Sequence, residues 1–140
     1  MSGQSVTFKL SADQAIPDNS NTFVGWDSNS GNAGLLSSWD SSSKTWTVAS
    51  GQDGIYAISF DAVFAGQASG ARQAEVVVNG QPAAAWFLPL TGSAEFCGFV
   101  ASLTQSLAVG DTVQFRVKQK SGSALNLRSA QSVAYLTRHT

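Results

Sequence analysis

The sequence predicts an all-β fold, a jelly-roll β-sandwich of about eight to ten antiparallel strands in a single domain. Alternation of apolar and polar residues with a period of two recurs along the chain, as it does in strands with one buried face. Clusters of turn-forming residues separate these runs at the spacing of sandwich strands. No window of a dozen residues has helical periodicity, and strong helix formers such as Lys and Glu are scarce.

Each alternating run defines one expected strand and its apolar face. Run by run, these residues are Val6, Phe8 and Leu10; Tyr56, Ile58, Phe60, Ala62 and Phe64; Ala74, Val76 and Val78; Val113, Phe115 and Val117; and Val133 and Tyr135. Asn79-Gly80 predicts a hairpin turn, because both residues tolerate positive φ. Residues 82–86 are expected to form a strand rather than a helical turn. Residues 1–20 are expected to be an N-terminal arm with the first strand, and residues 21–140 the jelly-roll domain.

Low charge is the chain's main compositional feature. Only 12% of the residues are charged, against about 25% in typical soluble domains, whereas 21 Ser and 9 Thr are present. The net charge of -1 excludes the basic footprint of a nucleic-acid-binding protein. No apolar stretch is long enough to span a membrane, and the N-terminus does not resemble a signal peptide. We therefore expect neither a nucleic-acid nor a membrane partner, and synthesis in a cytoplasm.

Catalytic chemistry has little support in the sequence. His139 is the single histidine and Cys97 the single cysteine, so a nucleophilic triad, a disulfide and a zinc site are all disfavoured. Cys97 is expected to be a buried, inert thiol. The segment from Asp27 does not fit a calcium loop, because position twelve is not Glu. A carboxylate pair such as Glu75 with Glu95 stays formally open. We expect no catalytic residue, cofactor or metal, and hence no enzyme.

The four tryptophans leave two interpretations open. Trp26, Trp39 and Trp46 crowd into a polar third of the chain, and Trp86 stands alone. Indole rings fill cores and subunit interfaces, and exposed ones stack on sugar rings. Trp46 alternates with two threonines and is expected in the core. Trp26, Trp39 and Trp86 are the candidates for contact with a ligand or partner.

Several motifs resemble the complement-head and tumour-necrosis-factor-like jelly rolls. Gly54-Ile-Tyr-Ala-Ile-Ser-Phe60 is similar to the family's Gly-x-Tyr-x-Phe-x-Phe strand, and Ala74-Glu-Val-Val-Val-Asn-Gly80 to its strand ending in Asn-Gly. The run from Leu107 to Val117 is similar to its Leu-x-x-Gly-Asp-x-Val strand, and Ser132-Val-Ala-Tyr-Leu136 lies where its closing strand would be. The likeness extends over residues 21–138 in the right order.

The resemblance implies a homotrimer with aromatic residues around a threefold axis. Tyr56, Phe115 and Tyr135 match axis-side positions, and Ile58 and Phe60 share the face of Tyr56. In the alternative, a monomeric sandwich, these residues are simply core. The family's proline before the Gly-x-Tyr strand and its Phe-x-Gly-Phe in the last strand are missing here, which favours a divergent bacteriophage version.

These expectations combine into a non-enzymatic, trimeric structural protein on the virion surface of a tailed phage. A capsid decoration or cement protein at threefold positions fits best, with residues 1–20 as the attachment arm. A receptor-binding knob of a tail or head fibre is the near alternative, so capsid or tail proteins are the expected partners. A carbohydrate-binding module that uses exposed Trp to bind host-surface glycan is the third hypothesis.

Overall fold

The computed structural model describes the chain over residues 4–65, 70–90 and 96–139, with side chains outside 88–100. Within these residues the structure has thirteen strands and one four-residue helix, more elements than the eight to ten strands predicted. Six of the thirteen strands have only two or three residues, and such short pieces account for the excess. In order, the elements are β1 (Gln4–Lys9), β2 (Gln14–Ile16), β3 (Thr22–Phe23), β4 (Ser30–Gly31), α1 (Ala33–Leu36), β5 (Trp39–Asp40), β6 (Thr45–Thr47), β7 (Gly54–Ala65), β8 (Gly70–Val78), β9 (Gln81–Leu90), β10 (Phe96–Leu107), β11 (Thr112–Gln119), β12 (Leu125–Leu127) and β13 (Val133–His139).

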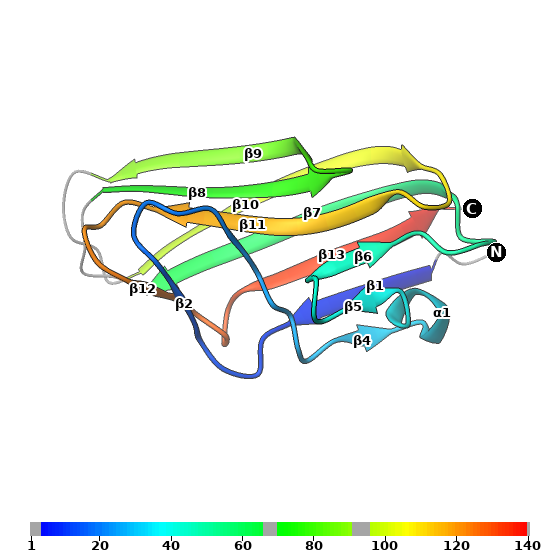
Figure 1. The fold of residues 1–140 in the computed structure, drawn as a ribbon, viewed down its shortest axis with the longest axis horizontal. Helices are drawn as coiled ribbons and strands as arrows, with labels where there is room; N and C mark the ends of the chain where they lie inside the picture. Colours follow the sequence, from blue (N-terminus) through cyan, green and yellow to red (C-terminus); the bar gives the residue numbers. More distant parts are fainter. Residues whose placement is uncertain (1–3, 66–69, 91–95, 140) are drawn as a thin grey trace.

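The strands form two antiparallel sheets that pack face to face (Figure 1). Sheet A has the order β2-β12-β7-β13-β1-β4, with β10 paired to the other side of β7. Sheet B has the order β5-β6-β11-β8-β9, with β3 also paired to β11. The prediction of an antiparallel jelly-roll sandwich is confirmed.

The hairpin turn and the following strand that the sequence predicts are both present in the structure. Asn79 and Gly80 join β8 to β9 with φ of 52° and 78°, as the hairpin prediction requires. Residues 82–86 lie in β9, so the expected strand is confirmed there. Gly70 opens β8 at φ +105°, and a Cβ there would lie 1.8 Å from the Lys120 carbonyl oxygen. Glycine is therefore the residue that this approach of two backbones requires.

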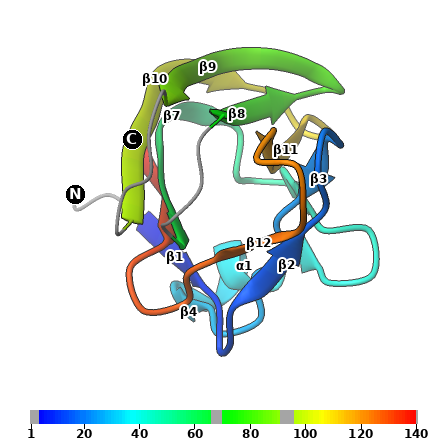
Figure 2. The same cartoon turned by 90° about the vertical axis from the view of Figure 1, so that its left-hand side faces the viewer.

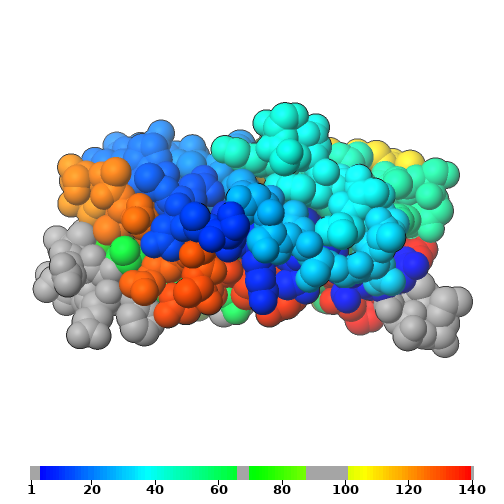
Figure 3. Space-filling view, turned by 90° about the horizontal axis from the view of Figure 1, so that it is seen from below, coloured from blue at the N-terminus to red at the C-terminus, as the bar shows by residue number. Residues whose placement is uncertain are grey.

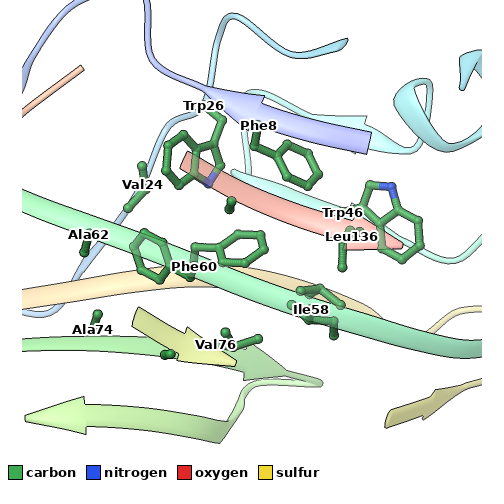
Figure 4. Close-up of a cluster of buried hydrophobic side chains, with 14 of the residues drawn as sticks. Phe8, Val24, Trp26, Trp46, Ile58, Phe60, Ala62, Ala74, Val76 and Leu136 are labelled. Carbon is green, nitrogen blue, oxygen red and sulfur yellow. The ribbon is translucent and has the colours of Figure 1, made fainter. Parts of the chain in front are cut away.

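The core lies between the two sheets and includes a cluster of aromatic rings that contact one another (Figure 4). Phe60 of sheet A meets Phe115 of sheet B at 5.4 Å between ring centroids, and Trp26 packs edge-on against both rings. Trp46 is fully buried, as predicted, and its indole N–H donates to the Leu35 carbonyl oxygen at 2.8 Å. Tilted and T-shaped contacts of this kind are the favoured geometries of aromatic pairs.

The two flanks of the sandwich differ. Seen from below (Figure 3), loops from the first fifty residues and the segment before β13 cover one flank. On the opposite flank, β9 ends sheet B and β10 ends sheet A, and the two strands contact each other. Figure 2 shows these edge strands together at one corner of the molecule. The molecule therefore has one flank closed by loops and one formed by two strand edges.

Candidate functional site: the outer face of sheet A

The outer face of sheet A is formed by the side chains of β1, β13, β7 and β10 that alternate with the core residues. The inward residues of β7 are all buried, so the residues between them point outward. Ala101, Leu103 and Leu107 of β10 likewise pack on the core. The outer face consists of Ser5, Thr7 and Lys9 of β1; Val133, Tyr135 and Thr137 of β13; Ile55, Ala57, Ser59, Asp61 and Val63 of β7; and Ser102, Thr104 and Ser106 of β10.

An open hollow of about 330 Å³ lies at the middle of this face. The register places Ser59 between Tyr135 on β13 and Ser102 on β10, so small side chains lie beside one large ring. The lining residues are Ala57, Ile58, Ser59, Ser102, Leu103, Thr104, Tyr135 and Thr137. None of them is charged. Tyr135 as a whole residue is 41% exposed, which leaves it available to a partner.

Asp61 is the acidic residue of the outer face. In the strand register, Asp61 of β7 pairs with Val133 of β13. Val133 pairs in turn with Lys9 of β1, the basic residue of the same face. Partial burial raises the pKa of the Asp61 carboxyl from its ordinary value of 3.8, because desolvation disfavours the charged form. Asp61 is thus a partly desolvated carboxylate on an otherwise nearly uncharged surface.

Replacement of Asp61 by asparagine is expected to raise the melting temperature at pH 7. Because the pKa of Asp61 is raised in the folded chain, its contribution to stability is greatest below pH 3.8 and is lost as pH rises through the folded pKa. Asparagine has no such titration, so the advantage of Asp61→Asn should shrink to nothing as the pH falls below 3.8. Differential scanning calorimetry of both proteins, from pH 7 to below pH 3.8, measures the difference in melting temperature. A difference that grows toward low pH would contradict the raised pKa of Asp61.

Four of the five residues expected at a threefold axis lie in the core instead. Tyr56, Ile58, Phe60 and Phe115 are at most 1% exposed in the single chain, because they fill the space between the sheets. Placing these four at an interface was wrong: they are core, and Phe115 belongs to the opposite sheet. Tyr135 alone points outward. Alternation gave the correct grouping within β7, but it did not say which face of the strand was the inner one.

The tryptophan candidates separate in the same way. Trp26 is 1% exposed and packs against Phe60 and Phe115, so its assignment to a ligand contact was wrong. Trp39 is partly exposed, and its ring lies 5.2 Å from that of Phe8 between centroids. Trp86 on β9 is exposed, in agreement with the requirement for a contact residue.

A second hollow, of about 440 Å³, lies near Asp13, Asp27 and Lys44. Ser129 donates to Asp13 through its backbone N–H at 2.8 Å and its hydroxyl, and Ser11 does the same for Asp27. These hydrogen bonds lower the pKa of both carboxyls. Both carboxylates are thus engaged in tying loops together, so this hollow is a weaker candidate than the outer face.

The catalytic and metal-binding candidates of the sequence lie only partly within the described residues. Among those residues, no three His, Cys, Asp or Glu side chains come together as metal ligands. Glu75 forms an ion pair with Arg116, with Nε and Oε1 at 2.9 Å. Glu95, its suggested carboxylate partner, and the side chain of Cys97 lie outside the described residues. No helix within them is both long and apolar enough to cross a bilayer.

Sequence reasoning missed the part of the hollow that β10 supplies. Ser102, Leu103 and Thr104 come from the second half of β10, where hydroxyl residues alternate with Leu103 and Leu107. The available signal was this alternation of Ser and Thr with apolar residues. It identifies an outward face, but a hydroxyl-rich face is equally typical of a solvated strand.

No protein-family model matches the chain, and no curated protein sequence matches it significantly. Solved structures do resemble it. Murine APRIL solved at pH 5.0 superposes with a TM-score of 0.71 at 14% identity, over 98% of this chain and 99% of that one. Murine APRIL at pH 8.5 gives a TM-score of 0.66 at 13% identity with the same coverage. The chain therefore has the tumour-necrosis-factor-like jelly-roll fold.

Proposed function

We propose that this protein is a non-enzymatic assembly and binding protein that works as a homotrimer, with the outer face of sheet A turned toward the threefold axis. The observation that supports the proposal is the composition of that face around Tyr135. Uncharged side chains, most of them small, surround an exposed aromatic residue over three adjacent strands. The uncharged middle of this face allows another chain to approach closely, while Asp61 and Lys9 are the charged residues elsewhere on the same face.

The distribution of charged residues over the two sheets supports the choice of sheet A as the contact surface. The outer face of sheet B carries the Arg116–Glu75 ion pair together with Gln114 and Lys118. Charged residues are depleted at the centres of subunit interfaces, so sheet A is the better contact surface. Cyclic symmetry would bury the same face in every copy, and it would need no charge compensation at its centre.

Within this class, the narrower proposal is a structural protein on the virion surface of a tailed phage. A trimer can match a threefold point of a shell by symmetry, which supports a decoration or cement role. A fibre knob that binds a receptor is the alternative within the same class. The copy number relative to the major capsid protein, measured on purified particles, separates them: a decoration protein is present in a fixed ratio to capsid subunits, and a fibre knob in a few copies.

Chemical modification of tyrosine tests the buried face. The chain has two tyrosines. Tyr56 is fully buried, and its hydroxyl donates to the Gln52 carbonyl oxygen at 2.6 Å. Tyr135 is therefore the tyrosine that a reagent can reach in a single chain. We expect tetranitromethane to leave Tyr135 unmodified in the assembled protein and to nitrate it once dilution dissociates the copies. Protein unfolded in guanidinium chloride, where both rings react, is the control. Rapid nitration of Tyr135 at every concentration would contradict the proposal.

A further inference from the structure

Two turn motifs of the sequence contact each other in the structure. Asn79 lies in the turn after β8 and Asp111 in the turn before β11, and these two strands pair directly. The Asn79 side chain is held at both of its polar atoms. Its Nδ2 donates to Asp111 Oδ1 at 3.1 Å, and its Oδ1 accepts from the Thr112 backbone N–H at 3.0 Å. We call these two contacts the turn clasp.

Asp111 is itself fixed in position by the chain around it. Its Oδ2 accepts from the Ala108 backbone N–H at 2.8 Å, so the carboxylate closes its own turn. The Val48 N–H donates to the Asp111 carbonyl oxygen, and the Gly110 N–H donates to the Val48 carbonyl oxygen, each at 2.9 Å. The clasp therefore holds the Asn79 amide against a partner that is anchored independently of it.

The residue after Asn79 makes this amide chemically vulnerable. Asn79 is the chain's single asparagine followed by glycine, and both residues of the pair are exposed to water. Glycine has no Cβ, so its main-chain nitrogen can approach the side-chain carbonyl carbon of a preceding asparagine with little steric hindrance. In the folded chain the clasp directs the Asn79 amide toward Asp111 and Thr112 instead. Attack by the Gly80 nitrogen therefore requires the clasp to open first.

We propose that Asn79 is a site of spontaneous deamidation, and that the turn clasp restrains the reaction in the folded chain. The Gly80 nitrogen forms a bond to Asn79 Cγ, its proton passes through water to Nδ2, and the Cγ–Nδ2 bond breaks to release ammonia. Water then opens the cyclic imide at one of its carbonyl carbons. Opening at Cγ leaves aspartate, and opening at the main-chain carbonyl carbon leaves isoaspartate. Water is the only co-reactant, and nothing is oxidised or reduced.

The reaction also destroys the clasp that restrains it. Aspartate at this position places a carboxylate oxygen where Asn79 Nδ2 now donates to Asp111 Oδ1 at 3.1 Å, so a hydrogen bond becomes a repulsion between like charges. Isoaspartate adds a methylene group to the main chain of a turn whose two central residues have φ of 52° and 78°. Either product is expected to separate the two turns, so the modification is a one-way change at this part of the fold.

The rate of amide loss at Asn79, followed by mass spectrometry of protein kept at neutral pH, tests the restraint. Asp111→Ala is expected to deamidate about tenfold or more faster than the folded wild type, because Asn79 loses a hydrogen bond to a charged group. Asp13→Ala is the matched control: it removes a carboxylate that accepts two hydrogen bonds from Ser129, and it should leave the rate at Asn79 unchanged. In guanidinium chloride all three proteins should react equally fast. A folded wild type that reacts as fast as the unfolded chain, or no faster reaction in Asp111→Ala, would overturn the inference.

An exchange of the two clasp side chains tests the effect of the product and does not depend on the alanine variant folding. Asn79→Asp reproduces the aspartate product and is expected to lower the melting temperature at neutral pH. Asn79→Asp combined with Asp111→Asn reverses the hydrogen bond between the two side chains and keeps an acceptor for the Ala108 and Thr112 N–H groups. The double variant should recover most of the lost melting temperature, as expected for directly coupled residues. A wild-type melting temperature for Asn79→Asp, or no recovery in the double variant, would contradict the proposed loss of the clasp.

Discussion

Replacement of Trp26 by alanine is expected to lower the free energy of unfolding by about 3–5 kcal/mol, the range for removal of a buried aromatic side chain. Trp26 lies between the sheets, 5.7 Å from the Phe60 ring and 6.1 Å from the Phe115 ring between centroids. Its indole nitrogen has no hydrogen-bond partner, so the substitution removes packing and leaves no polar group newly unpaired. Because domains of this size are stable by about 5–15 kcal/mol, the variant should lose a large share of its stability.

Denaturant unfolding followed by circular dichroism measures this effect, because that signal does not depend on tryptophan emission. Trp86→Ala is the matched control: it removes the same side chain from a half-exposed position and should change the stability of the isolated chain by about 0.5 kcal/mol or less. Equal losses for the two variants would contradict the placement of Trp26 in the core.

Replacement of Ser59 by lysine is expected to abolish assembly without unfolding the chain. Ser59 lies at the centre of the outer face between Tyr135 and Ser102, so the new side chain would place a cation in every copy near the axis. Burying like charges at one interface costs several kcal/mol, and 1.4 kcal/mol is tenfold in association, so about 1,000-fold weaker association is expected.

The same charge placed on sheet B is the control for that substitution. Gln114→Lys adds a lysine to an outward position of β11, beside residues that are already charged. Sedimentation velocity should show a single chain for Ser59→Lys and an unchanged assembly for Gln114→Lys, with identical circular dichroism spectra. Dissociation by both variants, or by neither, would exclude the outer face of sheet A as the specific interface.

The strands could be predicted from the sequence because alternation is a local property. Tyr56, Ile58, Phe60, Ala62 and Phe64 were grouped on one face, and all five are buried in the structure. The direction of that face could not be predicted, because it depends on where the second sheet lies. Tyr135 shows the same limit: its neighbours Ala134 and Leu136 are the buried residues of β13, so the larger aromatic residue points outward.

Trp26 shows why polar surroundings in the sequence misled the assignment of exposure. Ser, Asn and Asp flank it in a segment outside the strands, which is typical of a surface loop. Two residues before it, the Val24 N–H donates to the Phe115 carbonyl oxygen at 2.8 Å and fixes the loop against sheet B. The two residues of that contact are 91 positions apart along the chain, so no local pattern indicates it. The hollow likewise needs β7, β10 and β13 side by side before it exists.

Sedimentation equilibrium of the unmodified protein over a wide range of concentrations tests the central claim most directly. The account predicts a species of three times the 14.6 kDa chain mass, in reversible equilibrium with single chains at high dilution. A mass of one chain at every concentration would contradict it, and so would an assembly of two copies or an open-ended series of larger ones.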